Sequence, residues 1–193
     1  LPSDSSLSES DEVERQPTVT DHVFSLHSAT VRERLSSDRS FLPDEFQSRA
    51  FDSIDAGRSV LVSAPTGSGK TLVADYGIRL ALATQSRAIY TAPIKALSNQ
   101  KYRDWCGEYG EDHVGLLTGD ITINPDAPIM VMTTEVLRNM IYAGNDALDR
   151  LSVVVLDEVH FIQDAYRGGV WEEIIVHLAP EVRLDLPVSN CRQ

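Results

Sequence analysis

The segment from Ala64 to Thr71 holds the residue types best suited to phosphate chemistry. It reads Ala-Pro-Thr-Gly-Ser-Gly-Lys-Thr and follows a β-branched run, Val60–Ser63. Glycines let backbone amides turn toward phosphate oxygens, and the start of the next helix adds partial positive charge. We expect the Lys70 ammonium to reach the β- and γ-phosphates of a nucleoside triphosphate, and the Thr71 hydroxyl to coordinate Mg²⁺. The other expected phosphate-binding residues are Thr66, Gly67, Ser68 and Gly69.

This segment departs from the usual phosphate-loop pattern at one position, because Ala64 stands where the pattern has glycine. The structural alternative is a flexible turn between a strand and a helix, which would need neither a lysine nor a threonine at these places. Two glycines, a lysine and a hydroxyl in this order therefore favour nucleotide binding.

Two consecutive acids follow a second apolar run, Val153–Leu156. Carboxylates at the end of a buried strand can bind Mg²⁺, mostly through water, and can orient a water molecule for attack. We assign Asp157 to the metal and Glu158 to the attacking water. His160 lies two residues beyond the pair, and we interpret it as a link between nucleotide state and nucleic-acid binding. A solvated strand end is the structural alternative, and the phosphate-loop pattern upstream argues against it.

The elements that must position these residues alternate between short β-branched runs and helical patterns. This alternation predicts an α/β fold with a mostly parallel sheet and helices on both faces, whose ligands bind at the carboxyl ends of the strands. A helix should also begin near Pro43 and end at Gly57. The expected strands are 60–62, 88–90, 114–117, 129–132 and 153–156, and the other expected helices are 29–35, 70–83, 95–105, 134–142 and 170–178.

Composition limits the class of protein. The 193 residues carry a formal charge of −12, which argues against a basic protein that coats nucleic acid, and a 42% hydrophobic share supports one packed core. No apolar run approaches the roughly 20 residues of a membrane span. Cys106 and Cys191 are far apart in sequence and no signal peptide is evident, so we expect a cytoplasmic protein.

The motifs and the text between them resemble the DExH branch of the superfamily 2 helicases. Beyond APTGSGKT and DEVH, the segment TAPIKALSNQKY (91–102) resembles motif Ia of superkiller-type helicases associated with RNA exosomes. Three further segments (115–120, 133–140 and 167–173) are similar to other stretches of that group, and Phe41 with Phe46-Gln47 resembles its adenine-recognising Q-type motif. The resemblance runs from about Phe41 to Leu184.

This resemblance implies a RecA-like P-loop domain that uses ATP and Mg²⁺ and acts on single-stranded nucleic acid, most simply RNA. It implies that Phe41 and Gln47 recognise adenine. An acidic domain would then bind the nucleic-acid backbone locally, through hydroxyls and amides at helix starts and a few cations. Exposed charges and simple helix caps are the alternative for these residues, and we interpret Tyr90, Tyr102 and Trp105 as core. The expected nucleic-acid contacts are Pro93, Lys95, Gly119, Thr133, Thr134 and Arg138.

The expected organisation is a disordered acidic tail (1–20), an N-terminal extension (21–40), the first RecA-like domain (41–186) and an irregular, truncated end (187–193). The family's Ser-Ala-Thr motif should follow the strand near 182–186, where this chain has none, and the second RecA-like domain is missing. Two alternatives stay open. The helicase could act on DNA, or the chain as given could be a non-catalytic nucleotide-binding fragment.

Overall fold

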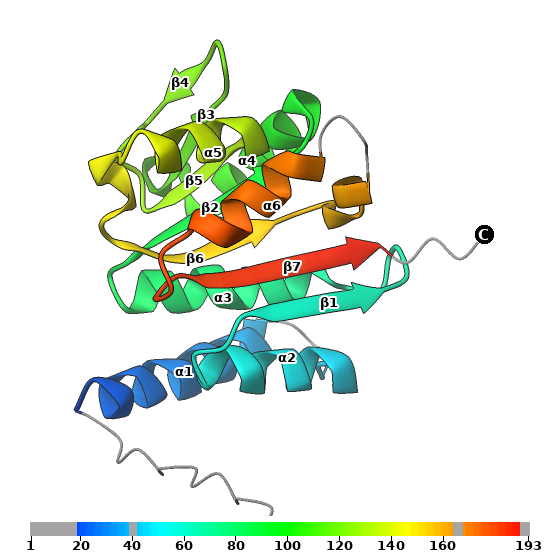
Figure 1. The fold of residues 1–193 in the computed structure, drawn as a ribbon. Coiled ribbons are helices and arrows are strands. Elements are labelled where there is room, and N and C mark those ends of the chain that lie inside the picture. The colour runs from blue at the N-terminus through cyan, green and yellow to red at the C-terminus, as the bar shows by residue number, and fades with distance from the viewer. Residues whose placement is uncertain (1–18, 39–41, 164–167, 190–193) are drawn as a thin grey trace, which may run out of the picture.

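The computed structural model describes residues 19–38, 42–163 and 168–189 of the chain (Figure 1). Seven strands in these residues form one sheet, in the order β1-β7-β6-β2-β5-β3-β4. All paired neighbours are parallel except β3 and β4. The strands are β1 (Val60–Ala64), β2 (Arg87–Ala92), β3 (Val114–Leu117), β4 (Thr122–Ile123), β5 (Ile129–Thr133), β6 (Leu151–Leu156) and β7 (Arg183–Ser189).

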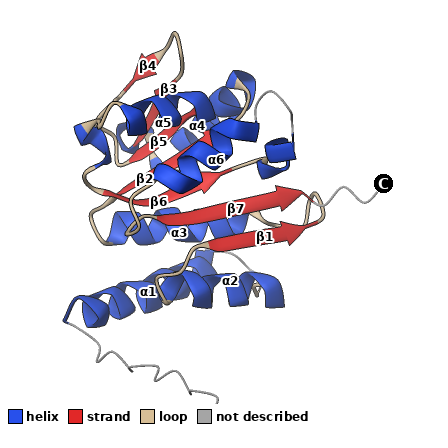
Figure 2. Cartoon of the chain, in the orientation of Figure 1, coloured by secondary structure: helices blue, strands red, loops and turns tan. Residues whose placement is uncertain are grey.

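Helices cover both faces of the central strands, as Figure 2 shows in blue against the red sheet. The α-helices are α1 (Val19–Asp38), α2 (Glu45–Asp55), α3 (Thr71–Ala83), α4 (Lys95–Tyr109), α5 (Thr134–Tyr142) and α6 (Gly168–His177). On one face, Ile78 of α3 and Trp105 of α4 join Val153 of β6 in an apolar cluster. On the other face, Leu137 of α5 and Trp171 of α6 belong to a second cluster. The predicted fold class is therefore confirmed.

The central strands show why the sequence predicted this fold. Strands β2 and β5 are buried at every position, which fits a parallel strand covered on both faces. Each holds a short apolar run, Ala88–Tyr90 and Ile129–Met132, instead of the alternation typical of a strand with one solvated face. Parallel strands need long connections, and α3, α4, α5 and α6 lie in the connections that follow β1, β2, β5 and β6.

The N-terminal helix is longer than predicted. We expected a short helix over 29–35, whereas α1 has 20 residues and begins at Val19, inside the stretch expected to be a tail. Among residues 27–37, where the structure describes the side chains of α1, Val31 and Leu35 are the buried apolar residues, and both belong to a third cluster with Phe51 and Tyr76. The predicted segment, 29–35, coincides with the part of α1 that holds these two buried residues. Residues 1–18 lie outside the described part of the chain.

Strand β7 also corrects an expectation, because residues 187–189 were predicted to be irregular. The strand continues to Ser189. Its residues from Asp185 to Ser189 pair with all five residues of β1, from Val60 to Ala64. Proline is normally absent from central strands because it lacks the backbone N–H that would pair with a neighbouring strand. Pairing between β6 and β7 ends at Asp185, so Pro187 lies where only β1 borders β7.

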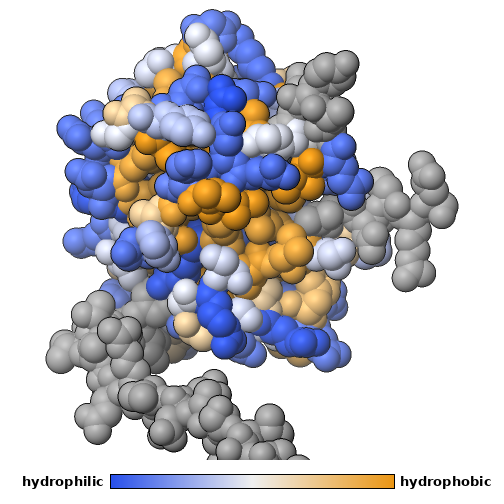
Figure 3. All heavy atoms as spheres, in the orientation of Figure 1, coloured by the Kyte–Doolittle hydropathy of each residue, from blue (hydrophilic) through white to orange (hydrophobic). Residues whose placement is uncertain are grey.

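Apolar side chains remain exposed on the side of the sheet where α6 lies. Figure 3 shows a band of them across the region that α6, β7 and β1 occupy in Figure 1. The most exposed large apolar residues of these elements are Val176 (74%) and Leu61 (65%). Helices therefore cover this end of the sheet less completely than its centre. Within the described residues, none of the helices combines the length and apolarity that crossing a bilayer requires.

Candidate functional site

The glycine-rich segment forms a loop between β1 and α3. Gly67 and Gly69 have φ angles of 81° and 82°, in the left-handed region that favours glycine. A Cβ at Gly67 would meet nothing within 4 Å, so the backbone angle alone demands glycine there. At Gly69 a Cβ would also lie 2.6 Å from the side-chain nitrogen of Gln47. The loop therefore has the conformation that the sequence predicted.

The loop lysine lies along its own backbone. Lys70 Nζ donates hydrogen bonds of 2.8 Å to the carbonyl oxygens of Ala64 and Pro65. Thr71 is exposed at the first position of α3. The ammonium and the hydroxyl thus both lie at the mouth of the loop, where helix α3 directs its N-terminal dipole.

Gln47 joins helix α2 to the loop. Its side chain is 2% exposed, accepts a 2.8 Å hydrogen bond from the Asp44 backbone N–H, and donates a 3.0 Å bond to the Gly69 carbonyl. The sequence assigned Gln47 to adenine recognition, and the structure places its amide against the phosphate loop instead of in open solvent. Phe41, its expected partner, lies outside the described residues.

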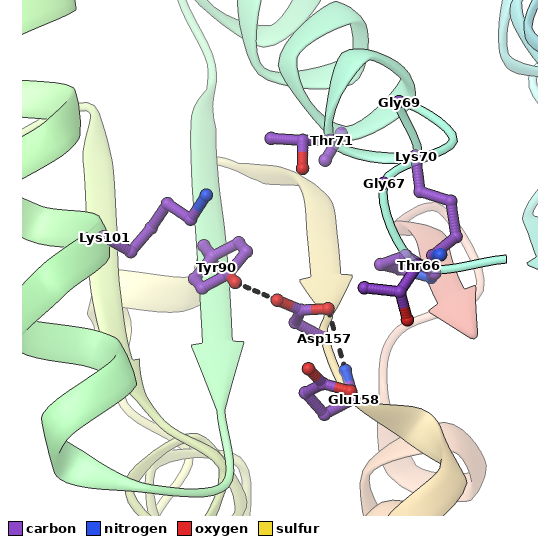
Figure 4. Close-up of a pocket in the computed structure, with 11 residues that line it drawn as sticks. Thr66, Gly67, Gly69, Lys70, Thr71, Tyr90, Lys101, Asp157 and Glu158 are labelled. Carbon is purple, nitrogen blue, oxygen red and sulfur yellow. Dashed lines mark hydrogen bonds between the residues drawn. The ribbon is translucent and has the colours of Figure 1, made fainter. Parts of the chain in front are cut away.

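The acidic pair follows β6 directly. Asp157 Oδ1 accepts a 2.8 Å hydrogen bond from the Glu158 N–H, and Oδ2 accepts one from the Tyr90 hydroxyl (Figure 4). Glu158 has a φ of 55°, a left-handed conformation that is uncommon for residues other than glycine. Such local strain is often kept at functional sites. His160 Nδ1 lies 3.1 Å from Glu158 Oε2, so the histidine holds the second acid.

One pocket brings the loop and the acids together, although Lys70 and Asp157 are 87 residues apart in sequence. Figure 4 shows their side chains around a common space. Oxygen donors of two elements, the Thr71 hydroxyl and the Asp157 carboxylate, line it, and such oxygens are the ligands that Mg²⁺ prefers. The donor set therefore fits Mg²⁺. The pocket is lined by Thr66, Gly67, Gly69, Lys70, Thr71, Ala74, Tyr90, Lys101, Asp157, Glu158 and Pro187.

Several predicted nucleic-acid contacts lie at the same edge of the sheet as this pocket. Pro93, Gly119 and Thr133 stand at or just after the carboxyl ends of β2, β3 and β5. Lys95 begins α4 and forms an ion pair with Asp120. These residues share one edge because parallel strands end together.

Two of the predicted contacts are placed less favourably. The side chain of Thr134 is fully buried, so its hydroxyl does not reach the surface in this structure, whereas Thr133 is 9% exposed. Arg138 lies in the second turn of α5, where it donates to Asn139 Oδ1 at 3.1 Å and lies 3.7 Å from Glu173 of α6. The pairing of Arg138 with an acid lowers the charge available for a phosphate.

The model of the DEAD/DEAH box helicase family matches residues 44–189, which contain both motifs of the pocket. This chain belongs to that family. The match covers most of the chain and spans every strand of the sheet.

Known relatives agree with the superkiller-type resemblance. The chain is 52% identical over 164 residues to the probable helicase HelY of Mycobacterium tuberculosis (83% of this chain, 18% of HelY). It is 49% identical over 156 residues to human exosome RNA helicase MTR4 (79% and 15%) and 50% identical over 146 residues to mouse Superkiller complex protein 2 (76% and 12%). The chain thus spans less than a fifth of the length of each of these relatives.

A solved structure shows the same fold. The Mycobacterium smegmatis helicase Lhr, bound to ssDNA and AMP-PNP, superposes with a TM-score of 0.67 at 25% sequence identity, covering 88% of this chain and 26% of Lhr. A helicase that holds a nucleotide analogue therefore shares the arrangement of strands and helices seen here, and this helicase domain has a RecA-like fold.

The structure adds three residues to the site that the sequence did not single out. Tyr90 is buried, as expected of a core residue, and its hydroxyl also contacts Asp157. Lys101 of α4 lines the pocket. Asp185 of β7 is 3% exposed and neither carboxylate oxygen has a hydrogen-bond partner among the described residues. Burial, with the nearby Asp157 charge, raises the pKa of Asp185 to about 7.

A sequence signal for these residues was weak. Tyr90 lies in an apolar run that predicts a buried strand. Lys101 lies inside a predicted helix whose segment was expected to contact nucleic acid. Asp185 lies between two leucines near the C-terminal end of the sequence. Each becomes notable only because the order of strands brings it close to Asp157.

Proposed function

We propose that this helicase domain binds ATP and Mg²⁺ and, within the complete protein, couples ATP hydrolysis to movement along RNA and to its unwinding. The observation that carries the proposal is the pocket that brings Lys70 and Thr71, at the start of α3, together with Asp157 and Glu158, which follow β6. This combination supplies a cation and backbone amides for phosphates, oxygen ligands for a metal, and a carboxylate for water.

Each residue has a separate task in this proposal. Lys70 and the loop amides would hold the β- and γ-phosphates, and phosphate oxygens would replace the carbonyls that Lys70 now contacts. Thr71 and Asp157 would hold Mg²⁺, which supplies charge neutralisation at the phosphates. Glu158 would accept a proton from the attacking water as that oxygen bonds to the γ-phosphorus and the bond to the ADP oxygen breaks.

His160 would keep Glu158 oriented through their 3.1 Å contact. The His160 side chain is 45% exposed, so a nucleic acid bound at the surface could contact it and thereby change the position of Glu158. This supports the interpretation that it links nucleic-acid binding to hydrolysis.

RNA is favoured over DNA by the names of the relatives, since MTR4 and DExH9 are described as RNA helicases at 49% identity. DNA has support of its own, because the Lhr structure contains ssDNA. Backbone contacts at helix starts carry little sequence information and suit either strand. The decisive measurement is whether single-stranded RNA or single-stranded DNA of equal length gives the larger stimulation of ATP hydrolysis by the complete protein.

The proposed roles are tested by two substitutions with opposite consequences. In the complete protein, Lys70→Ala should lower the affinity for an ATP analogue. In the same protein, Glu158→Gln should keep nucleotide binding and reduce ATP turnover by at least about 100-fold, the usual contribution of a general base. Glu172→Gln, an exposed acid on α6, is the matched control and should change neither. Unchanged hydrolysis in Glu158→Gln would contradict the water-positioning role.

The remaining alternative is that the chain is a nucleotide-binding fragment without catalysis. Analogue binding and RNA-stimulated ATP hydrolysis by the 193-residue chain alone test it. In related NTPases, an arginine supplied from outside the nucleotide-binding core contributes about 10³–10⁵ in rate. We therefore expect this chain to bind an ATP analogue and to show negligible RNA-stimulated hydrolysis. Substantial RNA-stimulated turnover by the chain alone would rule the fragment alternative out.

A further inference from the structure

The hydroxyl of Tyr90 contacts the acid that the proposed function assigns to the metal. Tyr90 belongs to β2, is 4% exposed, and lies in register with Val155, two residues before Asp157 on the neighbouring strand. From there its hydroxyl reaches along the strand direction and donates a hydrogen bond to Asp157 Oδ2 (Figure 4). The contact therefore joins two strands at the edge where the pocket opens.

Both oxygens of Asp157 are held by the protein. Oδ2 accepts from Tyr90, and Oδ1 accepts from the Glu158 N–H at 2.8 Å. A carboxylate has about four lone-pair sites, so these two bonds fix its plane and leave directions open for a metal or a metal-bound water. A carboxylate oxygen can only accept a hydrogen bond, so the Tyr90 hydroxyl is the donor of this pair.

The ring of Tyr90 is held in turn by helix α4. Trp105 packs edge-on against it with ring centroids 4.9 Å apart, and the Lys101 ammonium lies 5.4 Å from the centroid of each ring. Such cation–π and aromatic contacts restrict the ring while leaving its hydroxyl at the pocket. Asp157 is thus oriented by a residue whose own position is fixed by packing.

We propose that Tyr90 is a positioning residue that orients Asp157 for Mg²⁺. The inference rests on the proposed function, because it assumes that Asp157 binds the metal of a bound nucleotide. Groups that orient metal ligands from outside the coordination shell commonly change metal affinity by about 10–100-fold when removed. Tyr90 has that relation to Asp157, and nothing in its sequence position distinguishes it from a core aromatic.

Tyr90→Phe tests the inference, because it removes the hydroxyl and keeps the ring between Trp105 and Lys101. The 193-residue chain is titrated with Mg²⁺ in the presence of a fluorescent, non-hydrolysable ATP analogue. We expect the Mg²⁺ concentration at half-maximal binding to rise about tenfold in the variant. In EDTA, the affinity of Tyr90→Phe for the analogue should match that of the wild type. Among the described residues, the side-chain hydrogen bond of Tyr90 goes to Asp157 and to no residue of the phosphate loop.

Tyr109→Phe is the matched control. Tyr109 is a residue of α4 whose hydroxyl donates to a buried carboxylate, Asp75, outside the pocket. Its loss removes the same type of hydrogen bond and should leave the Mg²⁺ midpoint unchanged. Unfolding temperatures of both variants are measured first, and the titrations are run where every chain is folded, so that a general loss of stability does not produce the shift.

A double-mutant cycle with Asp157→Asn shows whether Tyr90 acts through Asp157. Tyr90→Phe should have no further effect on the Mg²⁺ midpoint when Asp157 is already asparagine. An unchanged midpoint in Tyr90→Phe alone, or an equal shift in both backgrounds, would overturn the inference and leave the proposed function intact. A wild-type chain that binds no analogue in Mg²⁺ would overturn the proposed function and this inference with it.

Discussion

The side-chain amide of Gln47 donates a 3.0 Å hydrogen bond to the carbonyl oxygen of Gly69, and this bond joins helix α2 to the phosphate loop. The other end of the same amide accepts from the Asp44 backbone at the start of α2. Gln47 therefore connects the helix start to the loop, and a base contact would have to use the second N–H of the amide or the second lone pair of Oε1.

We predict that Gln47→Leu weakens binding of ATP and GTP by the same factor, about fivefold. One net hydrogen bond contributes about 1 kcal/mol, and its loss loosens the loop for any triphosphate. Binding is measured by fluorescence titration of the two nucleotides, with Gln100→Leu, an exposed position on α4, as the control. A loss confined to ATP would contradict this prediction and support direct recognition of adenine.

The pocket was predictable because its chemistry is local in sequence. The order of glycine, lysine and threonine at 69–71 predicts phosphate binding, and the acids at 157–158 follow an apolar run that reads as a buried strand. The fold that unites them was predictable from the alternation of strands and helices, since carboxyl ends of parallel strands meet at one edge.

What the sequence did not predict depends on contacts between distant residues. Tyr90 and Asp157 are 67 residues apart, and only the β2–β6 register brings them together. Helix α1 packs on α2 and α3 through Val31 and Leu35, and it has no strong amphipathic pattern that would have revealed its full length. Strand β7 extends through Pro187 because β6 no longer pairs with it there, while β1 still does. No local sequence pattern reveals where that pairing with β6 ends.

We predict that Asp120→Asn strengthens binding of single-stranded RNA severalfold. Lys95 forms an ion pair with Asp120 at the edge where nucleic acid is expected, and a phosphate has to compete with that carboxylate. Both side chains are largely exposed, so the gain should be modest and should shrink as ionic strength rises. Fluorescence anisotropy of a labelled oligonucleotide at two salt concentrations measures it.

Asp149→Asn is the control for this change, because it removes the same charge at the opposite edge, just before β6. A simple effect of net charge would strengthen binding equally in both variants. Such a result would place the contact of Lys95 with RNA in doubt.

We predict that Arg32→Met lowers the free energy of unfolding by about 1–3 kcal/mol. Arg32 of α1 forms ion pairs with Asp52, at 2.8 Å, and with Asp55, and lies 3.3 Å from the Tyr76 hydroxyl. Methionine keeps much of the aliphatic volume but leaves those acids without the guanidinium. Urea unfolding should show the loss, and Arg34→Met, an exposed arginine of the same helix, should show little.

The carboxyl group of Asp185 is buried without a hydrogen-bond partner among the described residues. Its pKa is raised to about 7 by burial and by the charge of Asp157. In the unfolded chain this group loses its proton near pH 4. Between about pH 4 and 7 the folded state therefore binds one more proton than the unfolded state, and the free energy of unfolding falls as the pH rises.

Asp185→Asn should remove this pH dependence, because the amide resembles the protonated acid in shape and does not titrate. Three pKa units correspond to a difference on the order of 4 kcal/mol. The variant should therefore be more stable than the wild type at pH 8, by up to that amount, and similar to it near pH 4. Urea unfolding of both chains across this range gives the difference, and Asp126→Asn, an exposed acid, controls for the general effect of charge. Parallel curves for wild type and Asp185→Asn would show that Asp185 ionises normally in the folded protein.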